Sequence, residues 1–150
     1  MTSREAKEYL QRIESINIHI RNNAIEKAQH YALMMEAATS ITANMSGEKV
    51  QSSGSKQRMA DTVDNKLTYI QNIDGRIAEL EKEKAEIIST IELLPMDEYD
   101  VLHKCYVQRM GLKQVAAERD ESYSSTTTTH GKALTRLAAI LEKRKATICN

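Results

Sequence analysis

Hydroxyl and basic side chains recur on one face of the segment 122–141, and they are the best candidates for chemistry in this chain. Hydroxyl groups and cations bond phosphate oxygens, and threonine methyl groups contact the methyl groups of thymine. Helical spacing therefore predicts a surface for double-stranded DNA, with a merely solvated polar face as the alternative. The predicted contact residues are Ser124, Ser125, Thr127, Thr128, Lys132 and Arg136.

Other kinds of chemistry lack the residue spacing that they need. The four His are dispersed, and His103 and Cys105 face different directions on a helix. The sequence has no Cys-x-x-Cys pair, no glycine-rich phosphate loop and no spacing typical of a Ser-His-Asp triad. We therefore expect no catalytic residues, no metal site and no cofactor, and we predict that the protein is not an enzyme.

The predicted DNA surface follows two shorter helical segments. Residues 97–106 and 112–119 each place apolar side chains on one helical face, and Met110-Gly111 separates them. Asp120 and Glu121 supply a turn, and Ser122 is a residue type that caps helices. The order helix, helix, turn, helix is that of a helix-turn-helix, whose last helix lies in the major groove.

Composition predicts an all-α protein. The 150 residues include one Pro, five Gly and no Trp or Phe, so helix breakers and strand-favouring aromatic residues are scarce. Basic and acidic residues are equal at 21 each, but residues 95–150 hold nine basic and seven acidic side chains. The run Lys143-Arg144-Lys145 can attract phosphate or complement a helix C-terminus.

Residues 1–94 are predicted to form a long, coiled-coil-like helical hairpin. Residues at seven-residue spacing in 57–94 form two series. The first is Val63, Ile70, Ile77 and Ile91, with Lys84 in the missing place, and the second, three positions later, is Ile73, Leu80, Ile87 and Leu94. A weaker stripe occupies positions 10, 13, 16, 20, 24, 31, 34 and 35. The predicted partner is residues 4–38 folding back antiparallel across a loop at about 42–56, or a second copy of the protein.

The sequence predicts a cytoplasmic protein. No apolar run approaches the ~20 residues that span a membrane, so we expect no membrane partner. The first residues do not resemble a signal peptide. Two Cys, at 105 and 149, do not make a disulfide framework, which suits a reducing compartment.

The C-terminal segment resembles region 4 of sigma-70-type transcription factors, in which a polar residue, an apolar residue and Ala precede a Ser-capped recognition helix. The corresponding residues here are Gln114-Val115-Ala116 and Ser122. The whole chain resembles a phage- and prophage-encoded family of the RinA and ArpU late-transcription-regulator type. The shared stretches are AKEYL (6–10), ATSIT (38–42), VQSSGS (50–55), MAD (59–61), ELLP (92–95) and HGKAL (130–134).

The chain departs from the sigma-like pattern at several positions. Arg119 and Asp120 replace an apolar residue and a Gly before the turn, and Asp tolerates left-handed backbone geometry. Thr126 and Thr129 stand where Val and Ile are usual on the buried side, and Thr128 stands where Arg often faces out. We therefore expect a weakly stabilised module with reduced base readout.

Together these patterns predict a helical hairpin (1–94) followed by a sigma region 4-like helix-turn-helix (95–150). The resemblance implies a transcriptional regulator in a bacterial host cell that acts on promoter DNA, on RNA polymerase, or on both. A homodimer through the hairpin is a further expectation. The alternatives are a helical interaction adaptor without DNA binding and a packaging protein similar to a small terminase subunit.

Overall fold

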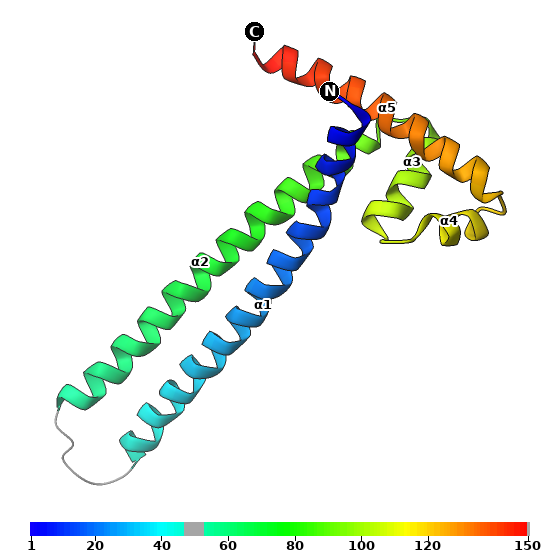
Figure 1. The fold of residues 1–150 in the computed structure, drawn as a ribbon. Coiled ribbons are helices and arrows are strands. Elements are labelled where there is room, and N and C mark those ends of the chain that lie inside the picture. Colours follow the sequence, from blue (N-terminus) through cyan, green and yellow to red (C-terminus); the bar gives the residue numbers. More distant parts are fainter. Residues whose placement is uncertain (47–52, 150) are drawn as a thin grey trace. The chain divides into compact units, whose positions relative to one another are not determined.

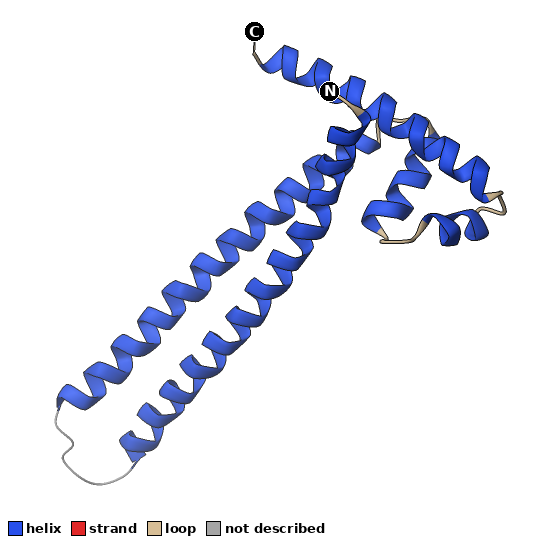
Figure 2. Ribbon diagram, in the orientation of Figure 1, coloured by secondary structure: helices blue, strands red, loops and turns tan. Residues whose placement is uncertain are grey.

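The computed structural model describes residues 1–46 and 53–149, and for 40–46 and 53–56 it describes the backbone only. The described residues form helices and contain no strand, which confirms the predicted all-α class (Figure 2). The elements in chain order are α1 (Ser3–Ser46), α2 (Ser53–Ile91), α3 (Met96–Leu102), the π-helix η1 (His103–Val107), α4 (Leu112–Glu118) and α5 (Tyr123–Ile148) (Figure 1).

The chain divides into two compact units. Unit 1 comprises Met1–Asn17 and Glu81–Asn150, and unit 2 comprises Ile18–Leu80, so α1 and α2 each contribute to both. This division differs from the predicted boundary between residues 94 and 95. Leu10 and Ile13 of α1 and Ile87 of α2 are buried within unit 1, which makes these helix ends part of its core.

Unit 2 is a pair of antiparallel helical segments. Lys27 Nζ lies 2.7 Å from Asp74 Oδ1, and His30 Nδ1 lies 3.1 Å from Lys66 Nζ. From the first pair to the second, the residue number rises on α1 and falls on α2, as expected for antiparallel helices. Ile73 of α2 is fully buried in this unit.

Burial follows the predicted stripes only in part. Ile70, Ile73, Ile87, Ile91 and Leu94 are buried as expected, whereas Val63, Ile77 and Leu80 are half-buried. In α1 the prediction is right for Leu10, Ile13 and Ile16 and wrong for Ala24, Tyr31 and Met35, which are exposed. A straight helix drifts about 20° per seven residues, and a pair of helices covers only a narrow face. Positions at the edge of the stripe therefore reach solvent.

The predicted loop at about 42–56 is helical at both of its ends. Helix α1 continues to Ser46 and α2 begins at Ser53, while 47–52 lie outside the described residues. Asn, Ser and Thr cost less than about 1 kcal/mol each in a helix, whereas extending an existing helix adds a backbone hydrogen bond per residue. Extension therefore overrides the local composition that favoured a loop.

The core of unit 1 lies under α5, which contacts both α3 and α4 (Figure 1). Helix α3 contributes Val101 and Leu102, and α4 contributes Val115 and Ala116, all buried as the sequence predicted. Cys105 and Tyr106, expected on the same face as Val101, are half-buried on η1. The buried residues of α5 are Thr126, Ala133, Leu134, Leu137, Ala138 and Leu141. These contacts hold the N-terminal half of α5 with its polar face exposed.

Candidate nucleic-acid interface

The helical segment predicted at 97–106 runs to Val107 and ends in an irregular way. The backbone N–H of Gln108 donates to His103 O at 3.0 Å, the wide bonding of a π-helix. Arg109 then adopts a left-handed φ of 61°, whereas Gly111 has an ordinary φ of −71°. The predicted break at Met110-Gly111 is therefore displaced to Arg109. Its side chain is held by Glu14, with 2.5 Å between Nη2 and Oε1.

The turn between α4 and α5 confirms the expected role of Asp120. Asp120 has a φ of 55°, the position at which many helices place Gly. The N–H of Glu121 donates to Ala116 O at 3.0 Å, and the N–H of Asp120 donates to Ala117 O at 3.3 Å. These two bonds form a Schellman motif, which satisfies the last carbonyls of α4 and sets the direction of the chain into α5.

Ser122 caps α5 as the sequence predicted. Its hydroxyl oxygen accepts a hydrogen bond from the N–H of Ser125 at 3.0 Å, and its backbone is extended, with φ −69° and ψ 151°. The cap satisfies one of the free N–H groups at the start of the helix. It therefore offsets part of the low helix propensity of the four consecutive Thr that follow.

A partly buried ionic cluster ties α3 to this turn. The guanidinium of Arg119, whose side chain is 11% exposed, pairs with Asp100 and with Glu121, the latter at 3.0 Å. The hydrogen bond with Glu121 is the largest cause that raises the pKa of Arg119, and burial opposes it. Lys104 reaches the same Asp100 at 2.9 Å. Arg119 thus links α3 to the turn that precedes α5.

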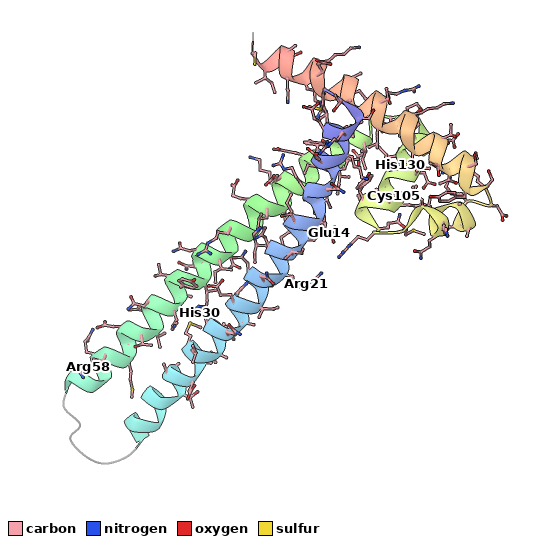
Figure 3. The ribbon with its side chains drawn as sticks, viewed as in Figure 1. Glu14, Arg21, His30, Arg58, Cys105 and His130 are labelled. Atoms are coloured by element: carbon pink, nitrogen blue, oxygen red, sulfur yellow. The ribbon has the colours of Figure 1, made fainter. Side chains whose placement is uncertain are left out.

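The inward face of α5 is polar at two points, and both have partners. Thr126 is fully buried and donates to Glu121 Oε2 at 3.4 Å. His130 stacks on Tyr106, with ring centroids 5.9 Å apart and 3.1 Å between Nε2 and the phenol oxygen. Burial lowers the pKa of His130, with a smaller contribution from Lys7. Figure 3 marks His130 on α5 and Cys105 on η1.

The predicted contact residues are all exposed on α5: Ser124, Ser125, Thr127, Thr128, Lys132 and Arg136. The hydroxyl of Thr127 donates to Tyr123 O at 2.8 Å, and that of Thr128 donates to Ser124 O at 2.9 Å. Exposure makes these side chains accessible to a partner, while their hydroxyl protons are already used within the helix.

The two basic candidates differ in their surroundings. Arg136 Nε lies 3.4 Å from Oε2 of Glu98, a buried oxygen of α3 that accepts no hydrogen bond. No carboxylate of the described residues lies within 4.0 Å of Lys132 Nζ. The sequence places no acid one helical turn from either cation, and Glu98 reaches Arg136 from a distant part of the chain. Lys132 keeps its charge available to an anion.

Tyr123 is missing from the predicted contact residues, whereas helical spacing places Gly131 on the outward face, where the sequence predicts a close backbone approach. Tyr123 is 52% exposed at the first position of α5, where its phenol can reach a phosphate or a base. In the sequence, the only signal for this role of Tyr123 is its position directly after the helix cap Ser122. Gly131 is exposed, and a Cβ built there would meet no atom within 4 Å, so packing within the protein does not require Gly. The bare backbone lies between Thr128 and Lys132 on the exposed side of the helix.

The charge around the site is balanced. Residues 112–132 hold three basic side chains (Lys113, Arg119, Lys132) and three acidic ones (Glu118, Asp120, Glu121). Attraction to phosphate therefore depends on few unpaired cations rather than on a basic patch.

Comparison of the chain with protein-family models, curated proteins and solved structures finds no match. In residues 1–46 and 53–149 no group of three His, Cys, Asp or Glu side chains is placed to hold a metal ion. Over the same part of the chain, none of the helices combines the length and apolar character needed to cross a bilayer.

Proposed function

We propose that the protein is a DNA-binding transcriptional regulator and that α3 to α5 form a helix-turn-helix of the sigma region 4 type. In this proposal α4 supports α5, and the N-terminal half of α5 enters the major groove. The observation that carries the proposal is the exposed hydroxyl face of α5, presented by a Ser122-capped helix that begins after a tight Asp120 turn. Lys132 supplies a phosphate contact.

The resemblance to phage late regulators extends the proposal to promoter DNA, RNA polymerase and the cytoplasm of a bacterial host. The long helices α1 and α2 would serve a homodimer or another protein partner. Exposed apolar side chains on unit 2 support a partner surface there. They are Ile18, Ile25, Tyr31, Leu33, Met35 and Leu67.

Fluorescence anisotropy of the full chain on a short labelled duplex at low salt tests DNA binding. Lys132→Glu places a negative charge against phosphate and should therefore weaken binding by about tenfold or more. A tenfold change corresponds to about 1.4 kcal/mol of binding free energy. Arg21→Glu makes the same charge change on an exposed side chain of unit 2 and serves as the matched control (Figure 3). It should leave affinity within about twofold.

Two results would contradict the proposal. One is the absence of binding by the full chain at low salt. The other is equal loss of affinity in both charge-reversal variants, which would mean that net charge, rather than the face of α5, attracts DNA. Circular dichroism of each variant establishes that the helices are intact.

The balanced charge at residues 112–132 favours a second candidate, a helical interaction adaptor that does not bind DNA. Absence of DNA binding together with a stable protein complex would support it. A packaging protein similar to a small terminase subunit is the third candidate. Ring-sized oligomers in light scattering would distinguish it from a regulator.

A further inference from the structure

Before Lys132, the exposed face of α5 lacks the side chains that read guanine and adenine with paired hydrogen bonds. Residues 123–132 contain no Arg, Asn or Gln, and Lys132 is their single cation. Arg or Lys on guanine, and Asn or Gln on adenine, account for most specific readout in the major groove. Any sequence preference at the exposed positions before Lys132 must therefore come from smaller groups.

Thr127 and Thr128 each have a methyl group and a hydroxyl group, and the structure uses the hydroxyl proton of both. These hydroxyls donate to the backbone carbonyls of Tyr123 and Ser124 at 2.8 and 2.9 Å. Donating to a base instead would break a bond that the helix already makes, so the net gain would be small. The methyl group has no such competing partner, and both residues are exposed.

Thymine is the base that matches a methyl group. Its C5-methyl projects into the major groove and distinguishes a T·A pair from the other pairs by apolar contact. Such contact requires carbon atoms to approach within about 4 Å. Gly131, three residues after Thr128 and exposed, leaves the helix surface without a side chain at that point. The helix can therefore come close enough for short threonine side chains to reach the base edges.

We propose that α5 reads thymine methyl groups in the major groove through the methyl groups of Thr127 and Thr128. This inference rests on the proposed DNA-binding function and adds the class of site that is bound: duplexes with T·A pairs, rather than guanines, opposite these two residues. Lys132 then contributes affinity for phosphate, and the two Thr contribute preference among sequences.

The first test measures the methyl group on the DNA. Sites for the full chain are selected from a random duplex library, and each thymine of the selected site is replaced in turn by deoxyuridine. The replacement removes the methyl group and leaves base pairing unchanged. At the positions facing Thr127 and Thr128 it should weaken binding about fourfold, the equivalent of about 0.8 kcal/mol for one buried methylene-sized group.

The second test measures the methyl group on the protein with matched variants. Thr127→Ser keeps the hydroxyl and removes the methyl, whereas Thr127→Val keeps a methyl and removes the hydroxyl. The Ser variant should lose the preference for thymine over uracil at one position, and the Val variant should retain it. The same pair at Thr128 should act on a different position. These positions are exposed, so the fold tolerates both changes.

The outcomes separate this inference from the proposed function. If the full chain binds no duplex, the proposed function fails. If it binds DNA but deoxyuridine has no effect, or the Ser variant keeps the preference for thymine, methyl readout is overturned while DNA binding stands. Selection of guanine-rich sites, or no enrichment of any sequence, overturns it in the same way.

Discussion

Gly131→Ala should stabilise the protein and weaken its binding to DNA. The residue is exposed within α5, and an added Cβ would meet no atom within 4 Å. Ala at such a helical site is favoured over Gly by about 0.8–1.0 kcal/mol, because it loses less backbone entropy on folding. For a chain of this size that gain raises the midpoint of thermal unfolding by about 2–4 °C.

The same methyl group would stand between α5 and the floor of the groove. If the helix backbone lies against DNA there, the added Cβ should cost about tenfold in affinity, or about 1.4 kcal/mol. Gly75→Ala is the matched control, because Gly75 is also an exposed helical Gly with no atom within 4 Å of a built Cβ, and it lies in unit 2. It should give similar stabilisation and unchanged DNA binding.

Thermal unfolding followed by circular dichroism measures the first effect, and anisotropy on a duplex measures the second. Stabilisation with unchanged affinity in Gly131→Ala would refute a close approach of α5 at this point. Destabilisation would refute the reasoning about space around the glycine. Loss of affinity in both glycine variants would show that the effect is not local to α5.

Four further substitutions test the packing within the two units. Arg119→Ala should lower the free energy of unfolding by about 1–2 kcal/mol, measured in urea, because Glu121 loses its partner and Asp100 keeps only Lys104; an effect below about 0.5 kcal/mol would mean that the cluster contributes no more than a surface ion pair. Ile73→Ala should cost about 3 kcal/mol, whereas Ile18→Ala at a 43% exposed site should cost under about 1 kcal/mol, and equal values would contradict the packing of unit 2. Burial lowers the pKa of His130 from 6.5, so the unfolded chain binds a proton first and stability should fall as the pH drops below about 6.5. The fall should be smaller in His130→Gln, and an unchanged profile there would assign it to other groups.

Local signals in the sequence predicted the parts of the site that depend on local chemistry. Ser122 was recognised as a cap because Ser accepts bonds from free N–H groups, and Asp120 was recognised as a turn residue because Asp tolerates left-handed geometry. The outward and inward faces of α5 followed from helical spacing alone. Helical spacing places Thr126 on the inward face, and the residue is buried there although its side chain is polar.

The features that sequence reasoning missed depend on contacts between distant residues. Arg136 meets Glu98 across 38 positions, and no local pattern signals that pair. The left-handed Arg109 follows a π-helix, a conformation that nearby packing sets more than residue preference does. The ends of the long helices were misjudged because extension of a helix outweighs a few polar residues, as at Ser46 and Ser53.

Backbone amide chemical shifts of the ¹⁵N-labelled full chain, recorded while a duplex is added, test the central claim most directly. The largest changes should fall on α5 between Tyr123 and Lys132, with smaller changes in the turn at Asp120. Changes confined to the basic run Lys143-Arg144-Lys145 would mean that phosphate attraction, rather than the recognition face, binds DNA. No changes at all, at low salt and excess duplex, would contradict DNA binding and leave the adaptor as the better account.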